Sequence, residues 1–387
     1  MVGKTIQNEA DANSDSFRVL APIERLIYQS SLLKFLLVTF FLAFVRVGIW
    51  CIPNVTSFVA VAKNPFVNPF DNPNAFYVLW TWLGSYIAWL IGANTEAGYL
   101  ALHFFFNLIF TAGFIALVTR RLDKKDARTA LVLFFLLPVS ITSYYWVSYD
   151  SFTLLLMMLA LVSTRVKILP LLIGIILGMQ HFEQSMFAVL ALCAAFILGG
   201  KAEKEYSGTW IFLLLVGVVI GKFILHFIFL RYHVHLNSGR TFWLNSHLSE
   251  ILQQFWYHMH YILWSTLGLG WVLALKSFDK GRKSLPLLIP LFGLMLLMPI
   301  VGDQTRVYAL CSFLLLSVYW LLNPEFLTGL NNRVVAGLFV LSNMMPLSWV
   351  WGGAPRSSSF PYDVQLILHQ AFGWFGVPTA LDGWPFG

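Results

Sequence analysis

Residues 98–125, GYLALHFFFNLIFTAGFIALVTRRLDKK, decide how this chain folds. From Gly98 to Thr119 no side chain is charged, and basic residues follow immediately. About 20 consecutive apolar residues are enough to cross the hydrocarbon core of a bilayer. Short loops rich in Lys and Arg stay on the cytoplasmic side of the membrane. The stretch therefore predicts a transmembrane helix over 98–119 that ends at the inner surface.

The composition of the whole chain agrees with a membrane protein. Of its 387 residues 58% are hydrophobic and only 11% are charged, whereas about 25% of a soluble domain is charged. The net charge of +7 comes from Lys and Arg clustered in short loops, so it does not indicate a nucleic-acid partner. The scattered cysteines form neither a disulfide framework nor a metal motif. We expect an integral, multi-pass membrane protein that contacts membrane lipids.

The chain divides into three parts. Residues 1–31 are polar and lack a cleavage-site pattern, which predicts a cytoplasmic tail without a cleaved signal peptide. Residues 32–351 form one transmembrane domain, with a first span over 32–52 and a first outer loop over 53–97. Residues 352–387 are expected to be a tail on the outer face. The bacterial inner membrane is favoured over the endoplasmic reticulum.

The segment from Tyr77 to Ile91 needs a separate placement. It is apolar but short, and it is rich in Trp and Tyr, which favour the membrane–water interface. If it crossed the membrane, the basic loop after Thr119 would lie outside. We therefore expect a helix on the outer membrane surface within the first outer loop.

The remaining chain alternates between outer polar loops and inner basic loops, which predicts an all-α fold with about eleven transmembrane helices. Spans with two clear boundaries are expected at 98–119, 127–141, 168–179, 209–230, 285–301 and 334–351. The fourth, sixth, eighth and tenth spans are expected to end near Ser163, Lys201, Lys276 and Asn323.

Unusual polar residues gather in the loops assigned to the outer face. Charged residues at the ends of spans are costly unless solvated or paired, so they often mark sites. Lys222 and His226 lie one turn apart within 209–230 and are expected to face the bundle. The outer candidates are Asp71, Asp150, His181 with Glu183, the segment Arg231–Arg240 with His247, and Asp303 with Arg306.

Each candidate also has a structural explanation. Asp71 lies in an Asn- and Pro-rich turn, where Asp commonly bends the chain, and Asp150 could cap the fourth span. Asp303 and Arg306 could simply pair three residues apart, and Lys222 could extend toward the inner leaflet. His181 and Glu183 could make loop hydrogen bonds. The aromatic residues Trp80, Trp82, Tyr145 and Trp146 are expected to anchor the interface rather than stack on a sugar.

Together the candidates indicate group transfer at the membrane surface. A carboxylate that takes a proton from an incoming hydroxyl must lie close to that surface when one substrate is a lipid. Cationic side chains must neutralise a lipid phosphate, which Arg does with its planar fork. Asp71 is the candidate base, and Arg306, Arg240 and Lys222 are the candidate phosphate ligands.

The arrangement resembles the GT-C superfamily of polytopic glycosyltransferases. The resemblance lies in Asp71 within a long first outer loop, a surface helix over 77–91, the basic turn after Thr119, Tyr149-Asp150 before the fourth span, and Asp303-x-x-Arg306 at a later span. It covers roughly residues 32–322. Members often carry two adjacent acids in the first loop, whereas Asp71 is followed by Asn72.

The resemblance implies transfer of a sugar from a polyprenyl-phosphate carrier to a lipid-linked or polymeric glycan at the outer face. Asp71 would be the base of an inverting displacement, and Arg306 would hold the carrier phosphate. Asp150 and Glu183 would orient the acceptor or, with Asp71, bind a divalent cation such as Mg²⁺ or Mn²⁺. The remaining expected substrate-binding residues are Asp303, Arg240, His181, Lys222 and His247.

Two other functions fit parts of the pattern. A polysaccharide polymerase or ligase acting on lipid-diphosphate glycans would use Arg240 and His247 in the late loop from Arg231 to His260. A lipid or small-molecule transporter would show repeats and polar residues at the membrane midplane. Here we find no internal repeat, and the midplane carries only Lys222 and His226.

Overall fold

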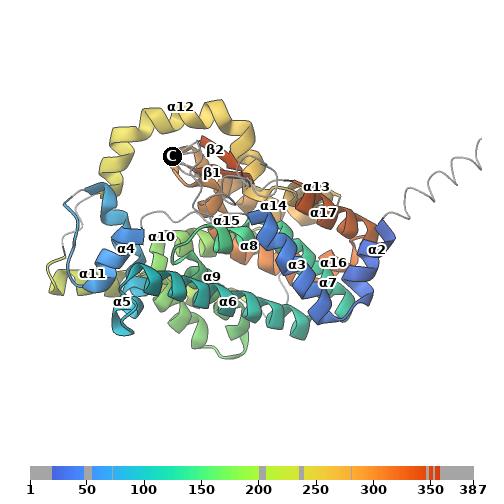
Figure 1. Cartoon of the computed structure of the whole chain (residues 1–387), viewed down its shortest axis with the longest axis horizontal. Helices are drawn as coiled ribbons and strands as arrows, with labels where there is room; N and C mark the ends of the chain where they lie inside the picture. Colours follow the sequence, from blue (N-terminus) through green and yellow to red (C-terminus); the bar gives the residue numbers. More distant parts are fainter. Residues whose placement is uncertain are drawn as a thin grey trace, which may run out of the picture.

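The computed structural model describes residues 20–47, 55–71, 73–199, 206–234, 239–279, 281–345, 348–351 and 354–357. Within these residues the chain is helical apart from its loops and one two-stranded hairpin (Figure 1). The predicted all-α class is therefore confirmed. The expected tails, 1–31 and 352–387, lie mostly outside the described residues.

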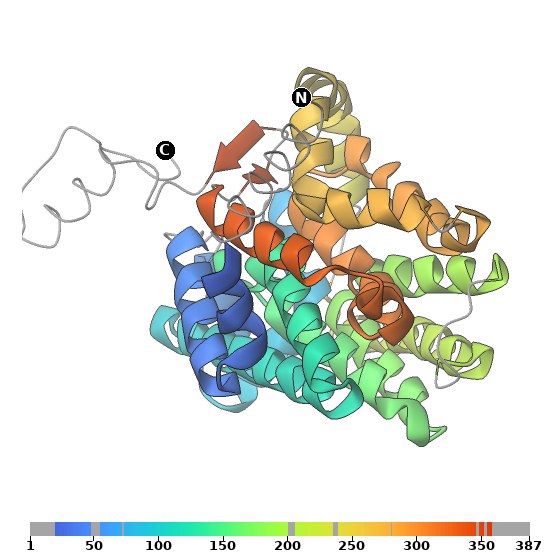
Figure 2. The same ribbon diagram turned by 90° about the vertical axis from the view of Figure 1, so that its right-hand side faces the viewer.

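The N-terminal helices are tied to the bundle by one buried arginine. Arg128 donates hydrogen bonds to the carbonyls of Ile27 (2.8 Å) and Ser30 (3.0 Å), and its guanidinium lies over the Phe35 ring. Figure 2 shows the resulting group of helices side by side. Its members are α2 (Ala21–Glu24), η2 (Arg25–Gln29), α3 (Leu32–Val47), α7 (Lys124–Leu136) and α17 (Asn332–Met344).

The predicted first outer loop is largely helical. It contains α4 (Val55–Lys63), a 3₁₀ segment η3 (Pro73–Thr81) and α5 (Trp82–Leu90). The helix expected over 77–91 is therefore present, but it is divided at Thr81. The Trp82 indole donates to the Pro65 carbonyl at 2.7 Å, so the loop is held against α5.

Proline 138 divides the third predicted span. The long helix α6 (Glu96–Arg121) matches the span expected over 98–119. After it, α7 ends before Pro138 and α8 (Pro138–Tyr145) leaves at 66°. Leu137 adopts an extended conformation (φ −74°, ψ 146°), which is the usual conformation before proline. The segment predicted as a span over 127–141 is therefore bent, and it is a span only if the bent pair crosses the membrane as one.

The helix α10 (Leu169–Ile197) reverses direction at His181, whose φ of −156° and ψ of 81° are not helical. Before the break, Gly174 and Gly178 pack against the backbone of α11 (Gly208–Arg231) near Leu214 and Val218. A straight helix would carry Phe196 about 27 Å beyond Gly178. Instead the Phe196 ring lies against Gly208, at the start of α11. The turn predicted at residues 180–184 is present within the range of α10.

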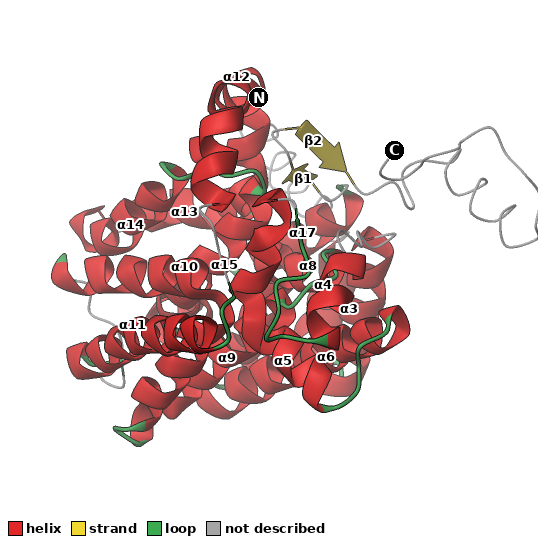
Figure 3. Cartoon of the chain, turned by 90° about the vertical axis from the view of Figure 1, so that its left-hand side faces the viewer, coloured by secondary structure: helices red, strands yellow, loops and turns green. Residues whose placement is uncertain are grey.

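Close glycine contacts join the first half of α10 to α11 (Figure 3). Gly174 and Gly178 face Gly217 and Gly221, so each helix contributes two glycines four residues apart. A Cβ atom at Gly178 would lie 2.1 Å from the Val218 oxygen. Small residues with this spacing let helix backbones approach closely in membranes.

The long outer loop expected from Arg231 to His260 is wrong for most of its length. Residues Gly239–Leu267 form one helix, α12, which arches over one end of the molecule in Figure 1. It then bends by 83° into α13 (Gly270–Phe278). Gly268 permits this bend with a φ of +54°. Polar side chains such as His247 and Gln253 concealed this helix, because they interrupt the apolar run that marks a span.

The C-terminal part also differs from expectation. The eleventh span predicted over 334–351 is instead α17, which ends at Met344, followed by an antiparallel hairpin of β1 (Ser348–Trp351) and β2 (Ala354–Ser357). Trp351 pairs with Ala354, and Ser348 pairs with Ser357. The preceding elements are η5 (Gly281–Ser284), α14 (Leu285–Met295), η6 (Met298–Ile300), α15 (Gln304–Leu316), η7 (Ser317–Leu321) and α16 (Pro324–Thr328).

Four helical segments among the described residues are long and apolar enough to cross a membrane, and up to six if each bent pair counts as one span. These four are α6, α10, α11 and η5–α14–η6. The structure thus supports a membrane protein but not the count of eleven spans. Large apolar side chains on α11, including Phe212, Phe223 and Phe227, are more than half exposed, as expected for a lipid-facing helix.

The two ends of the bundle differ in chemistry. At the end that we call the basic end, Arg121 of α6 donates to the Tyr206 hydroxyl and to the Leu161 carbonyl (3.1 Å). Leu161 lies near the end of α9 (Asp150–Val162), and η4 (Ser163–Arg165) follows. At the opposite end, which we call the site end, lie Asp150 and the start of α15.

Candidate functional site

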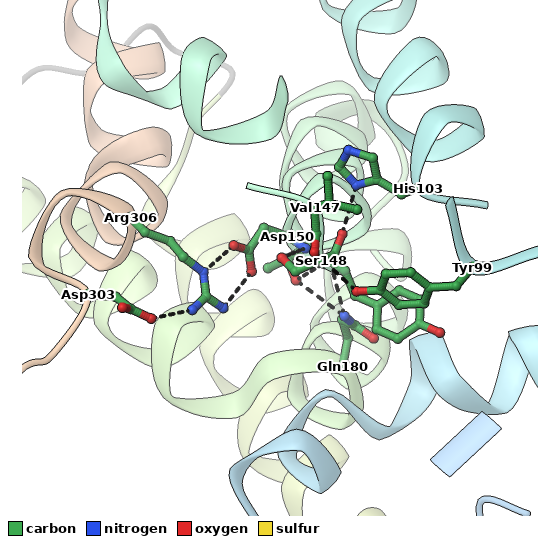
Figure 4. Close-up of polar contacts among 10 residues, drawn as sticks. Tyr99, His103, Val147, Ser148, Asp150, Gln180, Asp303 and Arg306 are labelled. Atoms are coloured by element: carbon green, nitrogen blue, oxygen red, sulfur yellow. Dashed lines mark hydrogen bonds and ion pairs between the residues drawn. The ribbon is translucent and has the colours of Figure 1, made fainter. Parts of the chain in front are cut away.

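A buried ion-pair network of three residues lies at the site end (Figure 4). Arg306 donates from Nε and Nη2 to the two carboxylate oxygens of Asp150, the second at 3.1 Å. Its Nη1 donates to Asp303 Oδ2 at 2.8 Å. The Asp150 side chain is 1% exposed, Arg306 11% and Asp303 20%. The sequence offered an Asp303–Arg306 pair as one explanation and named Asp150 as a separate candidate, but it did not predict that Asp150 pairs with Arg306.

Helix termini place these three residues. Asp150 is the first residue of α9, and its carboxylate faces Arg306 instead of capping the helix. Asp303 immediately precedes α15 and makes no side-chain capping bond. Because Asp303 and Arg306 are three residues apart, they share one side of the first turn. Two α-helices from distant parts of the chain therefore meet through one guanidinium.

A ladder of polar side chains on α6 fixes the segment that carries Asp150. The residues Tyr99, His103, Asn107 and Thr111 recur every four residues, so they lie on one face of α6. Their partners are the Val147 carbonyl (3.3 Å), the Ser148 carbonyl (3.0 Å), the Ser143 carbonyl (2.9 Å) and the Tyr144 hydroxyl (2.7 Å). Because a carbonyl only accepts, His103 Nδ1 carries a proton in this contact.

Gln180, one residue before the break in α10, completes the support. Its Oε1 accepts from the Gly84 backbone at 2.8 Å, and its Nε2 lies 3.4 Å from both the Tyr149 carbonyl and the Thr153 hydroxyl. Gly84 packs so closely on the Tyr149 ring that a Cβ atom there would lie 2.4 Å from it. The first outer loop, α9 and α10 are therefore joined directly behind Asp150.

Two stacked indoles cover the guanidinium of Arg306. Its Cζ lies 5.2 Å from the centroid of Trp146, and Trp146 stacks on Trp349 of β1 at 5.8 Å. Thr305 fixes the hairpin, because its Oγ1 donates to Ser265 Oγ (2.7 Å) and accepts from the Val350 backbone (3.0 Å). Trp82 and Trp146 are each 3% exposed, so their expected role as interface anchors is wrong. The side chain of Tyr145 lies outside the described residues.

Asp71, the predicted base, lies exposed in the loop between α4 and η3. Within the described chain no hydrogen bond or ion pair joins it to Asp150 or Arg306. The same loop nevertheless leads directly to the site, because Tyr77 of η3 lies within electrostatic range of Arg306. The structure thus brings Tyr77 of the loop that contains Asp71 within electrostatic range of Arg306, but among the described residues it shows no bond from the Asp71 carboxylate to the ion-pair network.

The break in α10 holds the predicted pair His181 and Glu183. His181 is buried, and Glu183 is partly buried within electrostatic range of Cys311 on α15. The two residues therefore lie in the interior of the bundle and not in an open loop.

Lys222 lies against the same region from α11. Its Nζ is 3.3 Å from the centroid of the Trp80 ring and 5.3 Å from that of Phe182, which is a cation–π arrangement. Lys222 therefore points toward the first outer loop and the break in α10, not toward the inner leaflet. His226 is exposed, so the prediction that it faces the bundle with Lys222 is wrong.

The remaining predicted ligands belong to α12. His247 is partly buried. The side chain of Arg240 lies outside the described residues. No contact described for α12 joins either residue to Arg306.

Among the described residues, no group of three His, Cys, Asp or Glu side chains is close enough to hold a metal ion. Asp71, Asp150 and Glu183, the candidate ligands for Mg²⁺ or Mn²⁺, are therefore not assembled into one. Asp150 instead uses both oxygens on Arg306.

Comparison with protein-family models, with curated proteins and with solved structures gives no match. The GT-C resemblance therefore rests on the residues of this chain alone.

Proposed function

We propose that the chain is a membrane glycosyltransferase that moves a sugar from a polyprenyl-phosphate carrier to a glycan acceptor at the site end of the bundle. The observation that carries this proposal is the fixed guanidinium of Arg306 at that end. Three of its five N–H groups are used by Asp150 and Asp303. Two remain for the oxygens of a phosphate.

The surroundings of Arg306 suit a substrate that is partly lipid and partly sugar. The buried indoles of Trp146 and Trp349 make the surroundings of the guanidinium apolar, and Lys222 adds a second cation next to Trp80. Since two carboxylates surround one guanidinium, the network carries a net negative charge, and the phosphate would depend on Lys222 for charge compensation. Asp150 therefore acts as a positioning residue, and Asp71 stays our choice for the base.

In this mechanism Asp71 removes the proton from the acceptor hydroxyl as its oxygen attacks the anomeric carbon of the donor. The bond from that carbon to the carrier phosphate breaks, and the polyprenyl phosphate leaves with the electron pair. One displacement inverts the anomeric configuration. The Asp71 carboxylate is exposed, so an acceptor that arrives from water can reach it.

The test is a transfer assay with the purified chain in lipid nanodiscs and a panel of radiolabelled polyprenyl-phosphate sugars. We expect Asp71→Asn to lower turnover by about 10²–10⁴-fold, the usual contribution of a general base. The matched control is Asp279→Asn, another exposed aspartate, near α13. Turnover within twofold of the unaltered protein for Asp71→Asn would remove the base assignment. Absence of transfer with every donor would remove the proposal itself.

A further inference from the structure

A buried glutamine at the start of α15 has no hydrogen-bond partner. Gln304 is 0% exposed, and neither its Nε2 nor its Oε1 is hydrogen-bonded within the described protein. Taking an amide from water to an apolar environment without a compensating hydrogen bond is unfavourable. Such a side chain is therefore expected to meet a polar group that binds there.

Gln304 faces a different part of the bundle from Arg306. Residues two apart on a helix point about 200° apart, so the two side chains leave α15 on opposite sides. Gln304 shares its face with Tyr308 and Cys311 at helical spacing. The Tyr308 hydroxyl donates to the Leu291 carbonyl of α14, and Cys311 lies within electrostatic range of Glu183. The Gln304 face is therefore turned toward α14 and the break in α10.

The break contributes a second carboxamide of the same kind. Gln184, three residues after His181, is 4% exposed, and its Oε1 has no hydrogen-bond partner within the described protein. The helix α10 packs on α15, and Glu183, which precedes Gln184 in the chain, lies within electrostatic range of Cys311 on the Gln304 face of α15. Each of these two packed helices thus carries one buried, neutral amide.

We propose that Gln304 and Gln184 form a second binding site, which takes the hydroxyl groups of a neutral sugar ring. A carboxamide donates through nitrogen and accepts through oxygen, and a hydroxyl does both, so adjacent sugar hydroxyls satisfy one amide completely. The charge of Glu183 disfavours an anion at this position. The identity of the ligand as a sugar rests on the proposed function, whereas the need for a neutral polar ligand does not.

Direct binding of free monosaccharides tests the site without any transfer reaction. The full chain is placed in nanodiscs, because the sugar of a maltoside detergent would compete. Glucose, galactose, mannose, N-acetylglucosamine and arabinose are added in turn while the midpoint of thermal unfolding is recorded. We expect at least one of them to raise the midpoint and Gln304→Leu to weaken its binding by tenfold or more. Gln253→Leu on the exposed side of α12 is the matched control and should bind normally.

The midpoint without sugar separates a ligand site from a buried water site. If the Gln304 amide is unpaired until a ligand binds, Gln304→Leu leaves the sugar-free midpoint unchanged or raises it. Replacing an unpaired polar group by an apolar one removes the cost of its desolvation. A lower sugar-free midpoint with normal sugar binding would show that water satisfies the amide, and it would overturn the proposal. Failure of every sugar to bind the unaltered chain would also overturn it.

Two further variants keep the result interpretable. Gln304→Asn retains the amide on a shorter stem and should bind with intermediate affinity, and Gln184→Leu should weaken binding even if Gln304→Leu does not fold. Normal sugar binding by both Gln304→Asn and Gln184→Leu would contradict the proposed binding site. Sugar binding without transfer would contradict only the proposed function, whereas transfer that is insensitive to both glutamines would contradict only this inference.

Discussion

At the scale of single residues, the molecule depends on the charge balance around Arg306. A guanidinium with 11% exposure is stable only because two carboxylates surround it. Breaking a buried pair by removing one partner is far more costly than the net value of the pair, since one charge is left buried and uncompensated. The two aspartates differ in this respect, because Asp150 is almost fully buried and Asp303 is not.

We therefore predict that Asp150→Asn destabilises the protein by about 3–5 kcal/mol, measured as a lower midpoint of thermal unfolding in nanodiscs. Asp303→Asn should cost less, because Asp303 is partly solvated. The control Asp279→Asn changes a side chain that is 76% exposed, and such surface changes usually stay within about 0.5 kcal/mol. Equal midpoints for Asp150→Asn and Asp279→Asn would show that the buried pair does not hold α9 to α15.

Sequence identified several site residues singly but could not combine them. Asp150, Asp303 and Arg306 stood out because a charge at the end of an apolar run is conspicuous. Tyr99, His103, Asn107 and Thr111 did not, since they lie within the apolar run of 98–119. Their spacing of four residues was the available signal, and it acquires meaning only when the partner segment 143–148 is known to lie alongside. Gln304 was not predicted as a site residue, because the charged side chains of Asp303 and Arg306 beside it were the conspicuous ones.

At the scale of elements, the contact between α10 and α11 holds the break of α10 in place. Backbone touches backbone at four glycines, so there is no side chain that could move aside. The two halves of α10 meet at His181, and the first half packs on α11 through these glycines. Any widening between α10 and α11 would move Gln180, which supports the segment before Asp150.

We predict that Gly178→Ala lowers the midpoint of thermal unfolding, by an overpacking cost of about 1–3 kcal/mol or more. The reason is that its Cβ would lie 2.1 Å from the Val218 oxygen. The control is Gly337→Ala in α17, where a Cβ meets nothing within 4 Å. There the better helix propensity of alanine should stabilise by up to about 1 kcal/mol. A change of the unfolding midpoint in the same direction for both variants would contradict the close approach of α10 and α11.

Elements with an uninterrupted apolar run were predictable, and those with a mixed surface were not. The expectation of 98–119 falls within α6, Glu96–Arg121, because lipid exposure and burial both require apolar residues there. In contrast, α12 has polar and apolar faces. A search for uninterrupted apolar runs, which identifies membrane spans, therefore does not detect it. The hairpin of β1 and β2 was missed because Ser348–Trp351 continues an apolar stretch, which reads equally well as the end of a helix.

At the scale of the whole molecule, the separation of the two ends predicts the orientation in the membrane. Arg121 meets the ends of α6 and α9 at the basic end, while Asp150 and Arg306 lie at the other. Because Lys and Arg favour the cytoplasmic side of a membrane, we predict that the site end faces outward.

Labelling of single cysteines tests this orientation in a background without the native cysteines. Asp71→Cys should react with a membrane-impermeant maleimide on intact cells, because Asp71 is exposed near the site end. Lys125→Cys, in the basic turn after α6, should react only after the cells are permeabilised. Reaction of Lys125→Cys on intact cells would invert the orientation and contradict an outward-facing site.

The short length of α9 determines how deep in the bilayer the ion-pair network is expected to lie. Asp150–Val162 is 13 residues long, which at 1.5 Å per residue spans about 20 Å, whereas the hydrocarbon core is about 30 Å thick. With the basic end at the cytoplasmic surface, we therefore expect Arg306 to lie below the outer headgroups, within the acyl-chain layer. A polyprenyl carrier could then enter sideways from the lipid with its tail still in the bilayer. A water-borne nucleotide sugar would instead have to leave the aqueous phase, an energetic cost that the proposed lipid-linked donor avoids.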